Sequence, residues 1–151
     1  SGTKALAEKV VLQNNPNSYV FRLRIPFDQY ASPRNYLTKL LSYDTLLDAE
    51  NSLSHRADFA KYVMELINQE VPHGIYNVTN KGSVTTKDVV ELIKKHNLSN
   101  KDFKFFDDLE SFGKETIAPR SNCVLDTTKI EQYTKIRTAT EALEESISKY
   151  K

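Results

Sequence analysis

The sequence predicts an α/β fold, in which helices cover a parallel or mixed sheet. Segments with apolar residues at helical spacing alternate along the chain with short runs rich in β-branched and aromatic residues. Clusters of Asn, Pro and Gly lie between several of these segments and predict turns. This repeated order of helix and strand is typical of sheets whose strands are joined by helical crossovers.

The opening segment predicts a helix followed by a strand. Residues 3–12 are mostly good helix formers, and their apolar members mark one face: Leu6, Val10 and Val11. A cluster of Asn and Pro at 14–17 predicts a turn. The alternating, β-rich segment 19–25 (YVFRLRI) then predicts a strand.

A second helix is predicted over residues 33–43. Ser32 has the residue type of an N-cap, and Pro33 suits the first helical position. The spacing puts an apolar side toward the core: Tyr36, Leu37, Leu40 and Leu41. It leaves a polar side that consists of Arg34, Asn35, Thr38 and Lys39.

The alternation continues to the end of the chain. Strands are predicted at 45–47, 73–80 and 103–106, and helices at 54–69, 107–112 and 127–130. The first of these helices is expected to bury Phe59, Val63, Leu66 and Ile67. Capping residues mark three further helix starts. A capping box begins at Thr85, Asp126 caps the helix at 127–130, and Thr138 and Glu141 form a capping box before the terminal helix.

Composition excludes several classes of function. The 151 residues suffice for one domain, and 21 Lys and Arg against 20 Asp and Glu leave a net charge of +1 with no basic block, so no nucleic-acid partner is expected. No run of about 18 apolar residues exists, so no membrane-spanning helix is expected. The lone cysteine, Cys123, forms no internal disulfide, and with no leader visible we expect a cytoplasmic protein.

No complete active site is visible in the motifs. The 4 glycines are scattered, so no glycine-rich phosphate loop is present. The 3 histidines lie far from one another in sequence and from the cysteine, so we expect no metal site.

The first residues, SGTKALAEK, resemble a segment of the extended short-chain dehydrogenase/reductases. In that segment a catalytic tyrosine is followed four residues later by a lysine, so the tyrosine would lie immediately before Ser1 and Lys4 is the lysine. The resemblance implies that Lys4 stabilises the phenolate and holds the nicotinamide ribose hydroxyls of the cofactor. A solvated helix lysine is the alternative interpretation of Lys4.

The resemblance covers nearly the whole chain. The blocks FRLRIPF, PRNYLTKLLSYD, NSLS, HGIYNVTNKGSVTTKDVVELIKK and APRSNCVLDTTKI are similar, in order and spacing, to the C-terminal half of nucleotide-sugar 4-ketoreductases. Within this group the chain resembles the bifunctional 3,5-epimerase/4-reductases of rhamnose synthesis, which are similar in fold to dTDP-4-dehydrorhamnose reductase. Lys81 departs from the pattern, because the family usually has proline there.

This resemblance implies the C-terminal, substrate-binding portion of a Rossmann-like, NAD(P)-dependent fold that lacks its dinucleotide-binding half. Residues 1–26 would end the Rossmann-like core, and 27–151 would form mainly the sugar-nucleotide-binding region, with some returning core elements. We expect the chain alone to be inactive. Exposed edge strands and apolar surface would favour association, which allows a homodimer.

The resemblance also assigns roles to individual residues. Lys39 becomes the acid/base that epimerises carbons next to the keto group, and Asn35, four residues earlier, a substrate contact on the same polar face. Arg120 and Asn122 become substrate contacts at the nucleotide diphosphate. Each has a structural alternative, a solvated helix for Lys39 and a connecting loop for Arg120 and Asn122.

Several other residues were weighed from the sequence alone. Arg24 precedes the end of a strand, where ligand loops begin in open α/β sheets. His55 and Arg56 lie at a helix start, where they meet either a phosphate or water. Asn77 is expected to end a strand, and Cys123 to be a buried or loop thiol.

The expected activity is the reduction of a UDP- or dTDP-4-keto-6-deoxyhexose with NADPH or NADH, with 3,5-epimerisation in addition. The expected partner is therefore a nucleotide-sugar substrate. The alternative is a non-catalytic, NADP-binding regulatory subunit with a reductase-like fold, because fold alone does not determine function.

Overall fold

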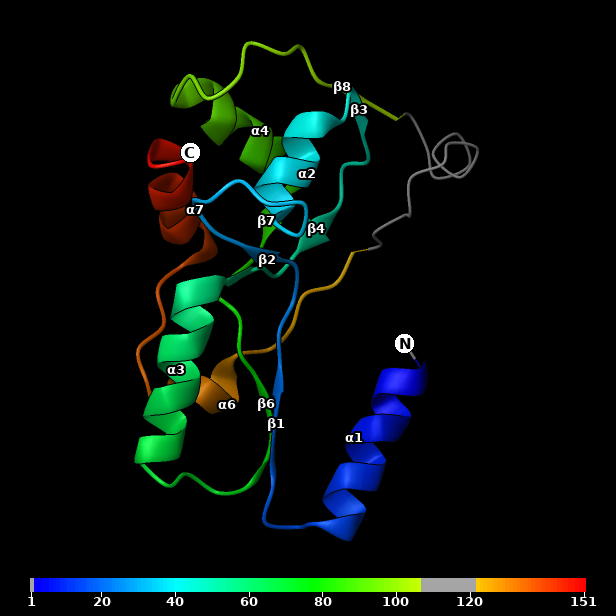
Figure 1. The fold of residues 1–151 in the computed structure, drawn as a ribbon, viewed down its shortest axis with the longest axis vertical. Coiled ribbons are helices and arrows are strands. Elements are labelled where there is room, and N and C mark those ends of the chain that lie inside the picture. Colours follow the sequence, from blue (N-terminus) through cyan, green and yellow to red (C-terminus); the bar gives the residue numbers. More distant parts are fainter. Residues whose placement is uncertain (1, 107–121) are drawn as a thin grey trace.

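The structure is a computed structural model and describes residues 2–106 and 122–151. Helices and short paired strands alternate along the chain, as the sequence predicts. Figure 1 shows two neighbouring groups of elements: α1, β1, β6, α3 and α6 at one end, and the shorter strands with α2, α4 and α7 at the other. The chain passes between the two groups several times.

The first group is built on a parallel ladder. Strand β1 (Tyr19–Arg22) pairs with β6 (Gly74–Asn77), with Tyr19 opposite Gly74. Helices α3 (Arg56–Asn68) and α6 (Thr128–Glu131) pack on one face of the ladder around Tyr76 and Ile130. Helix α1 (Gly2–Asn14) lies on the opposite side (Figure 1).

The apolar face predicted for α1 is open to solvent in this chain. Leu6 is 62% exposed, Val10 46% and Val11 44%. A two-pronged ion pair connects the helix to the ladder, because both Arg22 side-chain donors lie 2.7 Å from the Glu8 carboxylate.

The strand predicted at 19–25 is interrupted. Ile25 is buried and has φ +46, a left-handed conformation that costs a β-branched residue about 1–2 kcal/mol. β1 has already ended at Arg22, and the bend directs the chain into β2 (Pro26–Phe27), which pairs in parallel with β5 (Ser54–His55). The bend therefore moves the chain from one ladder to the next.

The second group surrounds the larger hydrophobic core. Helices α2 (Tyr36–Ser42), α4 (Thr86–Lys95) and α7 (Ala139–Ser148) contribute Leu37, Leu40, Val89, Ile93, Leu143 and Ile147. Two further ladders flank them: the parallel pair β3 (Thr45–Leu46) with β8 (Lys104–Phe105), and the antiparallel pair β4 (Glu50–Asn51) with β7 (Val84–Thr85).

The predicted start of α2 is wrong by three residues. The helix begins at Tyr36, and Asn35 is the N-cap, whose side chain accepts a hydrogen bond from the Leu37 N–H. Ser32 instead closes a turn, in which its carbonyl accepts from the Asn35 N–H at 3.0 Å. A proline at 33 suits this turn equally well, so the serine–proline pair marked the turn rather than the cap.

Helix α3 is rotated from the predicted orientation. Tyr62 and Leu66 are its buried side chains, whereas Ile67 is 41% exposed and Phe59 and Val63 are half-buried. The Tyr62 hydroxyl accepts a hydrogen bond from the Arg137 N–H at 3.0 Å. Because a tyrosine can bury its ring while its hydroxyl finds a partner, it occupies the centre of the contact.

Of the other predicted caps, the reciprocal capping box of Thr85 and Asp88 at α4 is confirmed. At α7 the Thr138 hydroxyl accepts from the Glu141 N–H as predicted, but the Glu141 carboxylate accepts from the Thr138 hydroxyl rather than from the Thr138 backbone, so the predicted capping box has only one of its two bonds. The N-cap position of α6 is Thr127 rather than the predicted Asp126, whose carboxylate accepts from the Thr128 N–H just before the helix. The helix predicted at 107–112 lies outside the described residues.

Helices long and apolar enough to cross a membrane are absent from the described part of the chain. The described residues also contain no cluster of three or more His, Cys, Asp or Glu side chains able to hold a metal ion.

Candidate functional site

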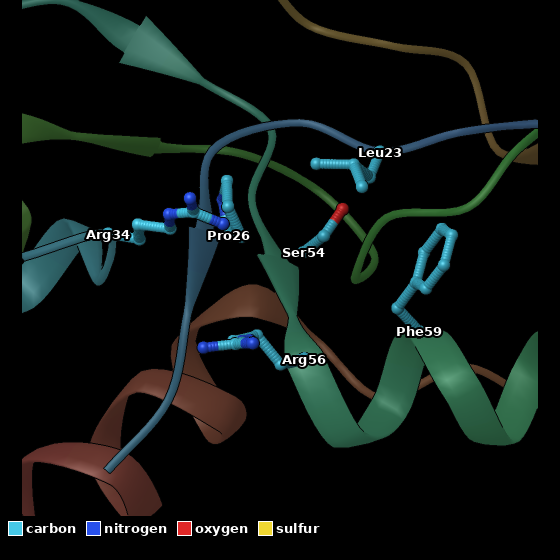
Figure 2. Close-up of a pocket in the computed structure, with 6 residues that line it drawn as sticks. All are labelled: Leu23, Pro26, Arg34, Ser54, Arg56 and Phe59. Carbon is cyan, nitrogen blue, oxygen red and sulfur yellow. The ribbon is translucent and has the colours of Figure 1, made fainter. Parts of the chain in front are cut away.

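A pocket of ≈ 290 Å³ lies where β1 and β6 end. Its lining side chains are Leu23, Pro26, Arg34, Ser54, Arg56 and Phe59 (Figure 2). The Ser54 hydroxyl connects the two strand ends, since it accepts from the Arg24 N–H at 3.0 Å and donates to the Val78 carbonyl at 2.9 Å. The pocket therefore lies at the carboxyl ends of parallel strands, the usual place for a ligand in an open α/β sheet.

The pocket has a cationic end and an apolar end. Figure 2 shows the side chains of Arg34 and Arg56 on the side where β2 passes, and Leu23 and Phe59 on the other. Guanidinium groups bind phosphate and carboxylate oxygens through paired N–H donors. The arrangement suits a ligand with a negatively charged group beside a less polar one.

The two pocket arginines retain unused donors. Arg56 has a side chain that is 55% exposed, and its nearest acid is Asp28 at 3.8 Å, which is too long for a hydrogen bond. Arg34 is exposed, and within the described residues its guanidinium has no ion-pair partner. Both side chains can therefore accept an anion without breaking a strong internal contact.

Asn35 holds the loop beneath this pocket. Its side chain is fully buried, donates to the carbonyls of Asp28 (2.8 Å) and Tyr30 (2.9 Å), and accepts from the Leu37 N–H (3.0 Å). The expectation that Asn35 shares an exposed polar face with Lys39 is wrong, because Asn35 points inward as the helix cap. These contacts favour a structural role, and its predicted substrate contact remains a prediction.

Lys39 is exposed on α2, and its side chain does not line the pocket. It lies in the last turn of the helix, where a lysine interacts favourably with the carbonyl end of the helix dipole. Its predicted role as acid/base is neither supported nor opposed by a contact in the described residues.

Lys4 lies in the first turn of α1, at the end of the helix that is nearer to the carboxyl end of β1. Helix α1 runs antiparallel to β1 (Figure 1), and Glu8 of α1 contacts Arg22, the last residue of β1. Lys4 is one helical turn before Glu8, so its Cα lies about 6 Å farther toward the carboxyl end of the strand. The exposed Lys4 side chain is thus placed beyond the strand end, in the direction where a ligand would bind.

Of the two predicted diphosphate contacts, Arg120 lies outside the described residues. Asn122 is exposed, and its side-chain oxygen accepts from the Glu50 N–H at 2.7 Å. Cys123 is half-buried, and its backbone forms an isolated parallel β-bridge with Asn51. Its thiol therefore lies in a loop, as predicted. The segment at 122–123 is therefore attached to β4.

The other residues weighed from the sequence have internal contacts. An Arg24 side-chain donor lies 2.8 Å from the Asn51 oxygen, and Asn77 ends β6 as predicted and donates to the Asp126 carbonyl. His55 is buried as the N-cap of α3, where its Nδ1 accepts from the Asp58 N–H at 3.3 Å. Only Arg56, among these four, faces the pocket.

A partly buried charge network joins α3 to α7. The Asp58 carboxylate accepts from Arg137 at 2.6 Å and from Asn80 at 2.7 Å, and Arg137 also contacts Glu145 at 3.3 Å. Burial raises the pKa of the Asp58 carboxyl, but the polar groups of His55, Arg137 and Asn80 outweigh it and hold the pKa at about 2. Asp58 is thus an ionised structural group.

Only part of this pocket is predictable from the sequence. The sequence predicts a phosphate or water contact for Arg56, a place on the polar side of a helix for Arg34, and burial in the core for Phe59. The sequence carries no signal that separates Arg34 from the other polar residues of the helix predicted at 33–43. It carries none for Ser54 either, because the position of Ser54 depends on pairing between strands that are distant in sequence.

No protein-family model matches the chain. Among curated proteins, it is 33% identical over 132 residues to a bifunctional dTDP-4-dehydrorhamnose 3,5-epimerase/dTDP-4-dehydrorhamnose reductase of Arabidopsis thaliana, which covers 87% of this chain and 43% of that protein. A trifunctional UDP-glucose 4,6-dehydratase/UDP-4-keto-6-deoxy-D-glucose 3,5-epimerase/UDP-4-keto-L-rhamnose-reductase of the same plant is 31% identical over 134 residues, 87% of this chain and 20% of that protein. The chain therefore spans less than half the length of these relatives.

Solved structures show the same fold. The L780 UDP-rhamnose synthase of Acanthamoeba polyphaga mimivirus superposes with a TM-score of 0.81 at 22% identity, covering 93% of this chain and 49% of that one. A dTDP-4-dehydrorhamnose reductase of Bacillus anthracis, solved in complex with NADP, gives a TM-score of 0.71 at 15% identity, covering 99% and 52%. The predicted α/β, Rossmann-like fold is thus confirmed, and the chain is homologous to the C-terminal portion of the rhamnose-synthesis epimerase/reductases.

Proposed function

We propose that this chain forms the substrate-binding part of an oxidoreductase that reduces a UDP- or dTDP-4-keto-6-deoxyhexose with NADPH or NADH and epimerises carbons 3 and 5. The observation that carries the proposal is the 132-residue match to a 3,5-epimerase/reductase, which extends over 87% of the chain. The pocket at the carboxyl ends of β1 and β6 supports it, because cations beside apolar side chains suit a nucleotide sugar. Residues 1–26 would complete the core of the reductase, and residues 27–151 would hold mainly the substrate.

Lys4 is the residue of this chain that we assign to the cofactor. The cofactor would supply a hydride to carbon 4 of the keto sugar. Lys4 fits a contact with the ribose hydroxyls because it is exposed and lies beyond the carboxyl end of β1. Its ammonium would also stabilise the phenolate of a nearby tyrosine that protonates the keto oxygen.

Lys39 is the residue that we assign to epimerisation. Removal of a proton from a carbon next to a carbonyl, and its return on the other face, needs a positioned acid/base. Lys39 is exposed and uncommitted to any ion pair within the described residues, so its amine is available to a substrate. Asn122 and Arg120 remain proposed contacts to the nucleotide diphosphate.

The first test is oxidation of NADPH and NADH by the complete protein that contains this chain. UDP- and dTDP-4-keto-6-deoxyglucose are offered in parallel. We expect turnover with at least one of them, and the preferred nucleotide identifies the substrate. Tight cofactor binding without turnover of either sugar would contradict the proposal and favour a regulatory subunit.

Two variants of that protein then separate the roles of the lysines. Lys39→Ala should abolish solvent-deuterium incorporation at carbons 3 and 5 but retain reduction of an already epimerised substrate. Lys4→Met should weaken cofactor binding and turnover together. Lys94→Ala, at an exposed position of α4, is the matched control and should change neither. Equal loss of both activities in Lys39→Ala would refute its assigned role.

We also propose that the complete protein belongs to the extended short-chain dehydrogenase/reductases, a membership that the assigned role of Lys4 would support. A cytoplasmic location and a homodimer remain predictions, which fractionation of cells and measurement of the mass in solution would test.

A further inference from the structure

Four of the five arginines of the described residues fall into two classes by their contacts with acids, and the fifth, Arg24, donates to the Asn51 side-chain oxygen. Arg22 is paired with Glu8, and Arg137 with Asp58 and Glu145. Arg34 and Arg56 lack a hydrogen-bonded acid in the described ranges, yet both line one pocket. Because both cations line one cavity, an anion bound in it would be attracted by both.

Asp28 attracts Arg56 without occupying its N–H donors. One carboxylate oxygen of Asp28 is held by the loop itself, since it accepts from the Tyr30 N–H at 3.0 Å and from the Asn35 amide at 3.1 Å. The other lies 3.8 Å from the Arg56 guanidinium. Arg56 is therefore attracted toward Asp28 while its N–H donors remain able to bind a ligand.

The apolar end of the pocket restricts the kind of anion that fits. Leu23 is 50% exposed, and with Phe59 it forms an apolar surface opposite the arginines (Figure 2). A ring of a sugar or base gains from packing against such a surface, whereas a free inorganic phosphate leaves it exposed to water. The pocket thus favours a phosphate ester with an organic group.

We infer that Arg34 and Arg56 together bind the diphosphate of a nucleotide-sugar substrate, with the organic group next to the diphosphate against Leu23 and Phe59. This inference rests on the proposed function and adds two residues that the sequence analysis did not assign to the substrate diphosphate. A diphosphate offers oxygens on two phosphorus atoms, so each guanidinium can form its own paired hydrogen bonds.

Calorimetric titration of the complete protein that contains this chain, at low ionic strength, tests the inference. UDP, dTDP, pyrophosphate, orthophosphate and NADP are the probes. We expect UDP or dTDP to bind at least tenfold more tightly than orthophosphate. Arg34→Met and Arg56→Met should each weaken this binding about tenfold or more, the loss typical of a charge-assisted contact.

Controls distinguish the pocket from general charge effects. Lys94→Met removes the same charge from α4 and should leave binding unchanged. Arg56→Lys should recover only part of the affinity, because lysine retains the charge but not the planar fork of donors. Melting temperatures of the same samples show that each variant is folded.

Several outcomes overturn the inference. They are an absence of UDP and dTDP binding by the wild-type protein, unchanged affinity for these nucleotides in both arginine variants, and a larger loss of affinity for NADP than for UDP or dTDP in those variants. Failure of the proposed function is a separate result, because it appears as absent turnover by the complete protein rather than as altered nucleotide affinity.

Discussion

Arg137, between α3 and α7, and the two arginines of the pocket differ in how fully their charges are paired. Arg137 is partly buried and bonds to Asp58 and Glu145, which come from the two helices it connects. Arg34 is exposed in a turn and Arg56 is exposed at the start of α3. The carboxylate nearest to Arg56, that of Asp28, is 3.8 Å away, beyond hydrogen-bond distance. The first arrangement stabilises the fold, whereas the second leaves binding capacity at the place where a ligand would enter.

The largest effect is expected where the paired network is broken. Asp58→Ala leaves Arg137 partly buried with one acid fewer and removes a partner of the buried Asn80. We expect a loss of about 3 kcal/mol in the free energy of unfolding, measured by urea denaturation. Glu144→Ala, which breaks the exposed pair with Lys95, is the control and should cost less than about 0.5 kcal/mol. Equal losses in the two variants would contradict the comparison.

The same network predicts how stability depends on acid. The pKa of Asp58 is about 2 in the folded chain, below the ordinary value of 3.8. A carboxyl group whose pKa is lowered by folding stabilises the folded state at pH values above its ordinary pKa. This stabilisation is lost as the pH falls from about 4 to about 2. With its side chain 13% exposed, Asp58 should contribute about 2 kcal/mol. The difference between wild type and Asp58→Asn should therefore shrink over this range; a constant difference would contradict the assignment.

An exposed but well-paired arginine provides the intermediate case. Glu8→Gln removes the two-pronged contact with Arg22, which connects α1 to the end of β1. We expect a loss of about 0.5 kcal/mol at low salt, because exposed pairs are weak, and a smaller loss at 1 M salt. Thermal unfolding at both salt concentrations measures it. A loss that salt does not reduce would show that packing, rather than charge, holds α1.

The smallest effect on stability is expected at the pocket itself. Arg34→Met and Arg56→Met break no hydrogen-bonded ion pair within the described residues, so each should change the free energy of unfolding by less than about 0.5 kcal/mol. Urea denaturation of the two variants beside Asp58→Ala provides the comparison. A loss above 1 kcal/mol in either would place that arginine in the structural class.

The fold was predictable because local signals agreed with the tertiary structure. The capping residues Thr85 and Thr138 begin helices as predicted, and the strand at 74–77 lies between the turns that bound it. The start of α2 was not predictable, because a serine–proline pair suits a turn as well as a helix start. Its position depends on Asn35 finding partners in the loop at 28–30, which is a tertiary contact.

The pocket was less predictable than the fold. Ser54 and Leu23 become neighbours only when β2 pairs with β5, and this pairing depends on the bend at Ile25, which no local residue type indicates. Arg56 could be suspected from its place at a helix start. Arg34 could not be distinguished from other polar residues, since only the three-dimensional arrangement shows which exposed cations lack an acid.

The Ser54 hydroxyl joins the ends of β1 and β6, so the pocket exists only while the chain is folded. The lining residues come from segments around 23–26, 34 and 54–59, so unfolding separates them and abolishes ligand affinity. By mass action, a ligand present at a hundred times its dissociation constant should then raise the free energy of unfolding by about 2.7 kcal/mol. For a domain of this size, that corresponds to a rise of roughly 5–10 °C in the melting temperature. A thermal-shift screen of phosphorylated compounds could therefore identify the pocket's ligand without any measurement of catalysis.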